Sequence, residues 1–371
     1  KQIRTESTEA LVKVGDPAAS RILIRTKQTA SFPYIQAAEI VSKIPVKDAE
    51  AFLRPLLDHP RSPVKNAAAV ALSRVGTEKS LPMLLDRFAA ADRHLQENIA
   101  DALAAIDSEK AVDPLCKHLT DEKQTAMAAA NALSRMTADT IASKVYAKMK
   151  ANPEINAPGA YILGRKQYGP AADTLRSRLR QADQGGQDQM AEALGRIGDR
   201  KSIDLLLKVA QRDNRRGSAG AIGALGHLKA EKAVPVLLEI LETGDRRLTA
   251  PTIFALGEIG DRAAAKPLID LYYESGMRYQ LQIGLALSNI GGPAVMDFIR
   301  NNIESGNEKR QKMAAYIMLK SDNDAIIPQA LKLLDHPSKT IRRYAMGALK
   351  NNTGLPYDTV AKWRDWAEKN Q

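Results

Sequence analysis

The sequence predicts an all-α protein, an array of about twelve short helical hairpins that share one continuous core. Three observations lead to this fold class. An apolar position, usually leucine, recurs every 30 or 31 residues, and proline recurs ten or eleven residues after it. Aromatic residues make up only 5% of the chain, so Ala, Leu, Ile and Val must fill the core. Strands favour aromatic and β-branched residues, whereas small aliphatic side chains suit tightly packed helices.

The repeat is clearest in four segments that share Ala-Leu followed by Gly or Ser: MAEALGRIGD (190–199), GAIGALGHLK (220–229), TIFALGEIGD (252–261) and IGLALSNIGG (283–292). We call the recurring apolar position the ladder. Its members are Leu11, Val41, Leu72, Leu103, Leu133, Leu163, Leu194, Leu225, Leu256, Leu287, Met318 and Leu349. A register kept over this length predicts that each repeat stacks on the next in the same way.

Each repeat is predicted to contain two helices, as residues 215–243 illustrate. Apolar residues in 215–228 lie three apart on one helical face, a break follows at 229–232, and a second apolar helix ends at Gly244. Proline is expected in the first turn of the second helix, where its missing N–H is not needed, at Pro82, Pro114, Pro235, Pro267 and Pro328. A helix-ending glycine and a capping acid are expected at Gly15-Asp16, Gly198-Asp199 and Gly260-Asp261.

This pattern resembles the HEAT-like repeat family, in the short variety also found in phycobilisome lyases, and the resemblance covers nearly the whole chain. It implies a right-handed α-α superhelix forming one continuous domain over residues 1–350, with the Ala-Leu-Gly helix of each repeat on the concave face. Proteins of this family mostly act as scaffolds and adaptors, and a minority handle chromophores or damaged DNA.

Residues 351–371 depart from the repeat and contain both tryptophans, Trp363 and Trp366, which lie three apart on one helical face. We expect a C-terminal helical cap whose tryptophans cover the core of the last repeat, because solenoids need capped ends. A ligand site is the alternative. The segment resembles the tail of some exported bacterial HEAT-like proteins, which implies the periplasm or the exterior, with the cytoplasm as the alternative.

The residues indicate no enzyme, no cofactor and no metal site. Cys116 is the single cysteine and lies in an apolar run, which predicts a buried hydrophobe. His59 and His336 occupy the same LLDHP turn in distant repeats, so they are expected to be solvated turn residues. The GSAG segment (217–220) lies inside a predicted helix, unlike a serine nucleophile. No apolar stretch approaches the roughly 18 residues of a membrane span.

Glycine recurs every third residue in one predicted helix, at Gly217, Gly220, Gly223 and Gly226. Each interior glycine costs about 1 kcal/mol relative to alanine, so the spacing needs a reason. One reason is close packing of neighbouring helices. The other is a bare stretch of concave surface that the backbone of a partner can approach.

A basic column is predicted in the C-terminal half of a chain whose net charge is +11. Its members, each 31 residues apart, are Arg216, Arg247, Arg278 and Lys309, and beside them lie Arg215, Arg246, Arg310, Arg342 and Arg343. The corresponding places in the N-terminal repeats hold Pro63, His94, Gln124, Glu154 and Gly185. The column is expected either to bind a partner or to pair with acids at the same turns, such as Asp213, Asp245 and Glu308. Exposed pairs contribute only about 0–1 kcal/mol, so stability alone explains the column poorly.

These observations favour a protein–protein interaction scaffold or adaptor that binds an acidic protein surface or segment along the concave, basic C-terminal half. One alternative is a nucleic-acid-binding protein whose basic column tracks phosphates. Against it, the concave face is expected to lack the aromatic groups on which single strands stack. The other alternative is a lyase-like protein that handles a cofactor or chromophore, which requires a pocket with convergent polar groups.

Overall fold

The computed structural model describes residues 8–10, 12–25, 32–46, 48–181, 186–212, 217–274 and 278–370. Within these ranges the regular structure is helical and contains no strand, so the predicted all-α superhelical repeat fold is confirmed. The chain forms two compact units. Unit 1 contains Lys1–Ala171 with Gln184–Gly186, and unit 2 contains Ala172–Asp183 with Gln187–Gln371. That residues 1–350 behave as one continuous domain stays a prediction.

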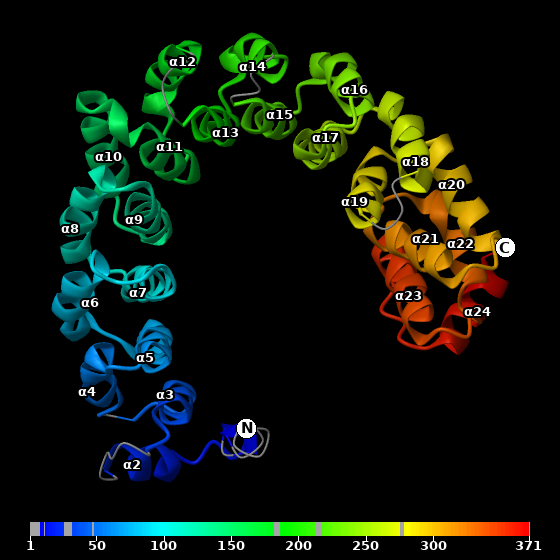
Figure 1. The fold of residues 1–371 in the computed structure, drawn as a ribbon. Coiled ribbons are helices and arrows are strands. Elements are labelled where there is room, and N and C mark those ends of the chain that lie inside the picture. Colours follow the sequence, from blue (N-terminus) through cyan, green and yellow to red (C-terminus); the bar gives the residue numbers. More distant parts are fainter. Residues whose placement is uncertain are drawn as a thin grey trace. The chain divides into compact units, whose positions relative to one another are not determined.

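Unit 1 has two rows of helices (Figure 1). The helices that carry the ladder are α3 (Tyr34–Lys43), α5 (Ser62–Val75), α7 (Arg93–Ile106), α9 (Lys123–Arg135) and α11 (Asn156–Arg165). The second helices of the hairpins are α2 (Pro17–Arg25), α4 (Ala49–Leu53), α6 (Leu81–Phe88), α8 (Val112–Lys117) and α10 (Thr140–Ala151). Each of the ladder helices packs against the next one along the row.

Unit 2 repeats this arrangement. Its ladder helices are α13 (Gln187–Ile197), α15 (Ser218–His227), α17 (Arg246–Ile259), α19 (Gln280–Ile290), α21 (Glu308–Lys320) and α23 (Lys339–Thr353). Its other helices are α12 (Ala172–Arg180), α14 (Ile203–Ala210), α16 (Val234–Glu242), α18 (Ala265–Glu274), α20 (Pro293–Glu304), α22 (Ile327–Lys332) and α24 (Val360–Lys369). Within this unit α13, α15 and α17 lie on the inner side of the bend and α14 and α16 on its outer side (Figure 1). The Ala-Leu-Gly helix is therefore the inner one here, as expected.

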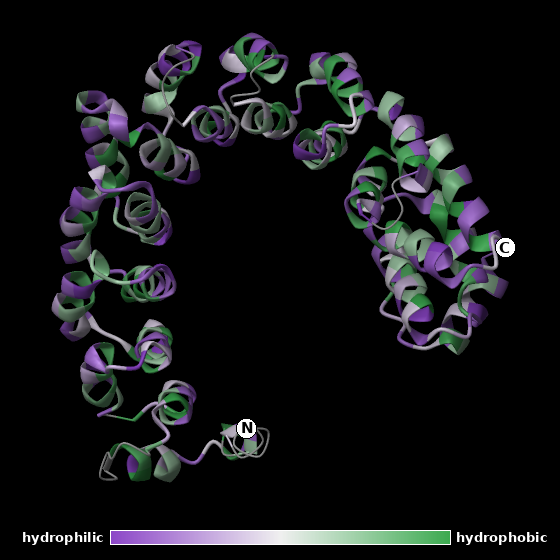
Figure 2. Cartoon of the chain, in the orientation of Figure 1, coloured by the Kyte–Doolittle hydropathy of each residue, from purple (hydrophilic) through white to green (hydrophobic). Residues whose placement is uncertain are grey.

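The ladder lies at the centre of the core in both units. Every ladder residue from Val41 to Leu349 is fully buried, with 0% exposure, and Leu11 lies outside the described residues. Hydrophobic and hydrophilic residues share the same helices along the chain (Figure 2). The helices are therefore amphipathic, as expected when one face packs in the core and the other is exposed to solvent.

The Ala-Leu-Gly motif is explained by contact between successive ladder helices. A Cβ added at Gly226 would lie 2.7 Å from the Cα of Ala255, which precedes the next ladder leucine. Gly195 approaches Ala224 in the same way, with 2.5 Å for the corresponding distance. The glycine after one ladder residue thus packs on the alanine before the next, and a side chain there would push the helices apart.

Close packing accounts for three of the four glycines at the start of and within α15, and the expected bare stretch of surface is reduced to one position. Gly226 is closely packed, and a Cβ at Gly220 would lie 2.2 Å from the carbonyl oxygen of Asp188. Gly217 has a φ of +80° at the start of the helix, which L side chains rarely adopt. Gly223 has no atom within 4 Å of the position of an added Cβ, so it alone is a bare point on the surface.

The turns follow the expected chemistry with one exception. The five prolines occupy the second or third position of α6, α8, α16, α18 and α22, each after a short 3-10 turn. Asp16 and Asp261 accept backbone N–H bonds two residues ahead, at 2.8 and 2.9 Å, and so cap the next turn. The capping predicted for Asp199 is wrong, because its carboxylate pairs with Arg176 and accepts no bond from that turn.

Polar clamps connect neighbouring repeats of unit 1. The Glu50 carboxylate accepts bonds from Thr77 N at 3.1 Å, Thr77 Oγ1 at 2.8 Å and Ser80 Oγ at 2.6 Å. Partial burial opposes ionisation of Glu50, but the bonds from Ser80 and Thr77 outweigh it and lower its pKa. Two repeats later the Asp107 carboxylate accepts bonds from Thr137 N at 2.7 Å and Thr137 Oγ1 at 2.6 Å. Such bonds fix the register between hairpins.

The C-terminal segment ends in α24, which packs on the last repeat, and that residues 351–371 serve as the cap of the solenoid stays a prediction. Trp363, in α24, is fully buried, and its Nε1–H donates to the carbonyl of Tyr357 at 3.1 Å. Trp366 is half-buried, and the two indole rings lie edge to face with centroids 5.8 Å apart. The helix packs beside α22, and an ion pair joins Arg364 to Asp335. Trp363 therefore covers the core, whereas Trp366 covers it only in part.

Candidate binding surface

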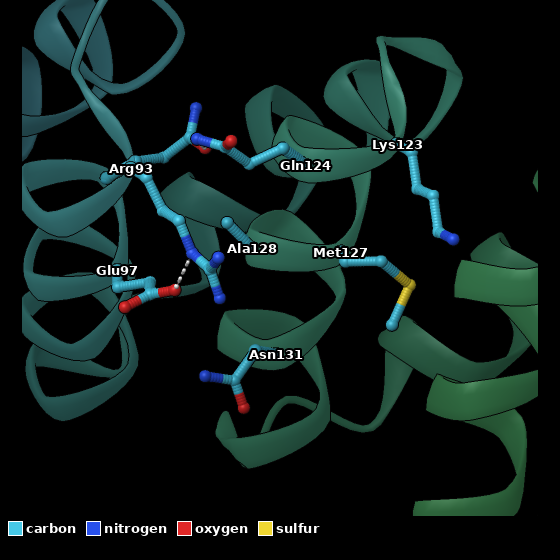
Figure 3. Close-up of a pocket in the computed structure, with 8 residues that line it drawn as sticks. Arg93, Glu97, Lys123, Gln124, Met127, Ala128 and Asn131 are labelled. Carbon is cyan, nitrogen blue, oxygen red and sulfur yellow. Dashed lines mark hydrogen bonds and ion pairs between the residues drawn. The ribbon is translucent and has the colours of Figure 1, made fainter.

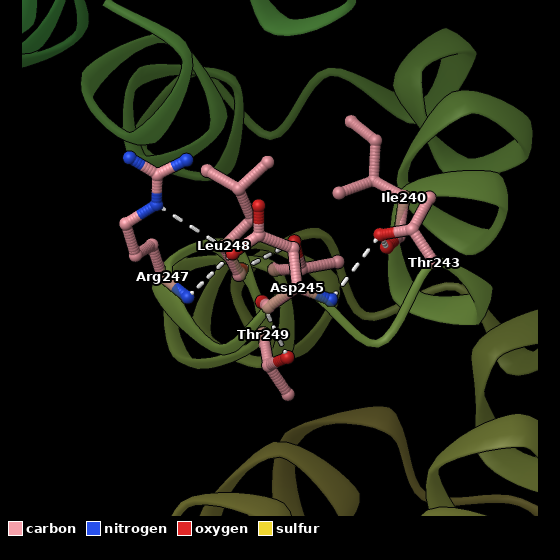
Figure 4. A network of polar contacts seen from close by, with 7 residues as sticks. Ile240, Thr243, Asp245, Arg247, Leu248 and Thr249 are labelled. Atoms are coloured by element: carbon pink, nitrogen blue, oxygen red, sulfur yellow. Dashed lines mark hydrogen bonds and ion pairs between the residues drawn. The ribbon is translucent and has the colours of Figure 1, made fainter. Parts of the chain in front are cut away.

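The basic column begins, within the described residues, at the N-terminus of α17. Arg246 and Arg247 are its first two residues, and both side chains are exposed. Asp245 caps the helix by accepting a bond from Arg247 N at 2.9 Å, and its Oδ1 lies 3.7 Å from the Arg247 Nε (Figure 4). The Arg247 side chain stays 75% exposed despite that weak ion pair. The Asp245 carboxylate therefore acts mainly as a helix cap and only weakly as an ion-pair partner of the Arg247 guanidinium.

The next two repeats place their bases at the same point. Arg278 is exposed two residues before α19, and Lys309 and Arg310 are exposed in the first turn of α21. The Arg310 guanidinium lies 5.3 Å from the centroid of the Tyr273 ring, a cation–π contact. Tyr273, Lys309 and Arg310 border a pocket of about 140 Å³. The Asn307 side chain caps α21, so the lysine and arginine side chains are not needed as caps.

The remaining basic residues divide into three cases. Arg343 is exposed in α23, with its guanidinium 5.7 Å from the Tyr344 ring centroid. Arg342 is half-buried, and its Nη1 donates to the carbonyls of His336 at 2.6 Å and Pro337 at 2.8 Å, so it holds the turn before α23. Arg215 and Arg216, with Asp213, lie outside the described residues.

His336 is a structural part of the same turn. Its Nδ1 accepts a bond from Ser338 N at 3.0 Å, which places the proton of the neutral ring on Nε2. Nε2 then donates to Gln311 Oε1 at 2.9 Å. His59 has the equivalent bond from Arg61 N, at 3.1 Å. The expectation of a turn role is confirmed for both histidines, but the expectation that they are solvated is wrong, because both are half-buried.

Ion pairs between repeats distinguish the column from other bases. Elsewhere a base pairs with an acid about 30 residues away in Arg87–Asp58, Lys110–Glu78, Arg135–Asp101, Lys144–Asp113, Lys232–Asp204 and Arg364–Asp335. Among the described residues, Arg246, Arg278, Lys309 and Arg310 have no ion pair, and Arg247 has only its weak contact with Asp245. Glu308 likewise pairs with none of them in these ranges. Among the column members that the structure describes, pairing within the turns therefore accounts for Arg247 alone.

The column also lies where positive charge is disfavoured. The N-terminus of a helix carries about half a positive charge from its aligned peptide dipoles. Cations at these positions lower the stability of the helix. The Asp245 cap offsets this effect in α17 and Glu308 offsets it in the first turn of α21, whereas α19 has no acidic residue at its N-cap or in its first turn. A neighbouring anion would relieve both the dipole and the side-chain repulsion. The surface is thus electrostatically suited to carboxylates or phosphates.

Sequence reasoning missed a second feature of the same face, a stripe of exposed apolar side chains. Phe254 on α17 and Leu285 on α19 lie two residues before their ladder residues and are 41% and 45% exposed. Tyr316 on α21 holds the same position and is half-buried. The expectation that this face lacks aromatic groups is therefore wrong. The signal was present in the 31-residue spacing of these three residues.

A larger pocket, of about 530 Å³, lies between α7 and α9 in unit 1 (Figure 3). Arg93, the first residue of α7, pairs with Glu97 there, with Nε and Oε1 3.0 Å apart. Gln96, which is 1% exposed, donates to the Phe88 carbonyl and Thr125 Oγ1 at 3.1 and 3.0 Å. Within the pocket lining, Gln124 Nε2 on α9 donates to Gln96 Oε1 on α7 at 3.3 Å, so the two glutamines join the helices.

In the part of the chain that the structure describes, no group of three or more His, Cys, Asp or Glu side chains is arranged to hold a metal ion. Burial raises the pKa of the Cys116 thiol to about 11, as expected of a buried hydrophobe. No described helix is both long and apolar enough to span a membrane.

Comparison with known proteins supports the repeat assignment. A family model for HEAT repeats matches residues 34–95 and 172–251, and a model for the PBS lyase HEAT-like repeat matches residues 95–121. No curated protein sequence matches the chain. The stacked hairpins with their buried ladder define an all-α superhelical repeat protein. The family matches show that residues 34–121 and 172–251 consist of HEAT-like repeats.

Three solved structures resemble the chain. An engineered protein is 20% identical, with 93% of this chain and 98% of that chain covered and a TM-score of 0.34. A chain from work on a phosphorylation switch in the interaction between cadherin and β-catenin is 12% identical, with 94% and 97% covered and a TM-score of 0.36. Human deoxyhypusine hydroxylase in complex with glycerol is 19% identical, with 68% and 99% covered and a TM-score of 0.29. At these values the similarity says nothing about what this chain binds.

Proposed function

We propose that this chain is a protein-interaction scaffold that binds an acidic partner along the basic column of unit 2. The observation that carries the proposal is the recurrence of exposed cations at the start of three successive ladder helices, in α17 at Arg246 and Arg247, before α19 at Arg278, and in α21 at Lys309 and Arg310. Arg215, Arg216 and Arg343 extend the proposed surface. Arg342 belongs to it by position, with its guanidinium held by the turn.

The spacing suits an elongated acidic ligand. Packed helices lie about 8–10 Å apart, which is close to the screening length of about 10 Å at 0.1 M salt. Neighbouring cations of the column therefore reinforce one another. A segment with several carboxylates would meet several cations at once, and its affinity would fall as the salt concentration rises.

The test is a triple charge reversal, Arg247→Glu, Arg278→Glu and Lys309→Glu, in the full chain. The partner is first recovered by affinity purification from the source cells, and its affinity is then measured at several salt concentrations. We expect at least a tenfold loss of affinity and a shallower salt dependence in the triple variant. A matched control carries Lys201→Glu, Lys208→Glu and Lys332→Glu, which make the same charge change at exposed positions outside the ladder helices. Unchanged binding in the first variant would show that the partner contacts another surface.

A second candidate function, nucleic-acid binding, is favoured by the aromatic rings beside the column. Phe254 is exposed on α17, and Tyr273 is 46% exposed beside Arg310. Bases stack on such rings, and Arg and Lys neutralise phosphates. A labelled single-stranded oligonucleotide measured beside the recovered protein partner separates the two functions. Column-dependent binding of the oligonucleotide without an acidic protein partner would favour this second function.

A further inference from the structure

The stripe and the basic column together form a two-part surface on three ladder helices. Seven residues separate each cation from the apolar residue of its repeat. In α17 and α21 these seven residues are about two helical turns, which places cation and apolar residue on one face about 10.5 Å apart along the axis, whereas Arg278 precedes the first residue of α19. The pairs are Arg247 with Phe254, Arg278 with Leu285, and Lys309 with Tyr316. Leu281, which is 61% exposed, lies between Arg278 and Leu285 on α19.

The stripe coincides with the column along the chain. At the same ladder position, other repeats carry polar residues, as at Asp101, Asn131 and Glu192, or the bare Gly223. In unit 1, Val70 on α5 is an exposed apolar residue at this position, at 40% exposure, and Tyr161 on α11 is half-buried like Tyr316. Only in α17, α19 and α21 do such residues follow one another in successive repeats of the described ranges. Apolar side chains left in solvent over three neighbouring helices, next to cations with at most one weak ion pair in those ranges, are typical of a surface that a partner covers.

We infer that the stripe docks an amphipathic, acidic α-helix of a protein partner, which lies across α17, α19 and α21. The inference rests on the proposed function and specifies its ligand. The apolar side of the docked helix covers Phe254, Leu285 and Tyr316, and its carboxylates reach the cations of the column. A helix is about 10–12 Å across, which matches the distance between stripe and column.

The repeat spacing favours a helix over an extended segment. Residues seven apart in a helix recur every 10.5 Å or so, close to the roughly 8–10 Å between packed ladder helices. In an extended segment, side chains on one face recur about every 6.8 Å. This spacing is shorter than the distance between ladder helices, so the side chains no longer match the helices after one repeat. We therefore expect the docked helix to have apolar residues at positions i, i+7 and i+14 and acidic residues on the adjoining side.

The probes are fluorescein-labelled synthetic peptides of about 20 residues, long enough to cross three ladder helices. The first has leucine at every seventh position and glutamate beside it on the helix. The second has the same composition in scrambled order, and the third is an extended peptide with leucine at alternate positions among glutamates. An oligothymidylate of similar length is the fourth. Affinities for the full chain are measured by fluorescence anisotropy.

The variant Phe254→Ser with Leu285→Ser tests the stripe, and Val70→Ser is its matched control. Both changes are at exposed positions, so the fold should be kept, which circular dichroism verifies. We expect the first peptide to bind at least tenfold more tightly than the scrambled peptide. We also expect the double variant to lose most of that advantage, whereas Val70→Ser keeps it.

The outcomes separate this inference from the proposed function. One outcome is that the ordered and scrambled peptides bind equally and that the triple charge reversal abolishes binding of both. This result would support binding of acidic ligands by the basic column and overturn helix docking on the stripe. Tighter, stripe-dependent binding of the extended peptide or the oligothymidylate would also overturn it. Failure of every acidic probe to respond to the charge reversal would count against the proposed function itself.

Discussion

Two identical substitutions three residues apart in α15 should have opposite effects on stability. Gly223 lies inside α15, where replacing glycine with alanine gains about 1 kcal/mol, and Gly226 lies in the last turn of that helix, where the intrinsic gain is at most about 1 kcal/mol. Their surroundings differ. At Gly223 no atom lies within 4 Å of the new Cβ, whereas at Gly226 the Cα of Ala255 lies 2.7 Å away.

The magnitude follows from these distances. Ordinary van der Waals contact of a Cβ begins at about 3.4 Å, so Gly226→Ala requires the backbone of α17 to move away by several tenths of an ångström. A backbone atom cannot rotate aside, and overpacking of this kind costs about 1–3 kcal/mol. Gly223→Ala should therefore stabilise the protein by about 1 kcal/mol. Gly226→Ala should destabilise it by up to about 2 kcal/mol, after the helix-propensity gain is subtracted.

Urea unfolding followed by far-ultraviolet circular dichroism measures both variants against the parent chain. Gly257→Ala, whose new Cβ would lie 2.7 Å from the Cα of Ala286, serves as a second closely packed position and should behave like Gly226→Ala. If Gly226→Ala stabilises the chain as much as Gly223→Ala does, the glycine–alanine contact does not constrain the spacing of the ladder helices, and the explanation of the motif is wrong.

Three further predictions follow from the repeat, the cap and the cysteine. Deletion of residues 218–248, one full repeat, should leave a helical, monodisperse chain because each repeat packs only on its neighbours; aggregation in size exclusion would contradict this. In a Trp366→Phe variant, the buried Trp363 should emit at short wavelength and shift to the red in denaturant, and a solvent-exposed native spectrum would argue against the cap. Since the pKa of Cys116 is raised to about 11, little thiolate exists at pH 8. Native protein should then react with iodoacetamide far more slowly than denatured protein and speed up as the pH approaches that value; equal rates would refute the burial.

Much of the fold is predictable from the sequence because its information is periodic. A residue at the ladder position has equivalent neighbours in every repeat. A prediction that Leu225 is buried therefore applies equally to Leu72 and Leu349, and all three are fully buried. The proline positions are predictable for a local reason, since a first helical turn requires no N–H from proline.

Caps and glycines are less predictable because their roles depend on partners distant in sequence. Gly198-Asp199 and Gly260-Asp261 have the same letters, but Asp199 pairs with Arg176 whereas Asp261 caps its turn. Gly223 and Gly226 differ only in whether the next ladder helix lies against them. No local pattern distinguishes these cases.

The sequence by itself determined the helical hairpin, the register of the array and the recurrence of cations at the start of the C-terminal ladder helices, because each depends on residue type at a fixed spacing. Only the tertiary structure decided that these cations lack ion pairs between repeats within the described ranges, that Arg342 is held by its turn, and that Phe254 and Leu285 face solvent. The physical reason is that the sequence does not distinguish a buried apolar residue of an amphipathic helix from an exposed one. Its exposure depends on the angle at which the neighbouring helix packs.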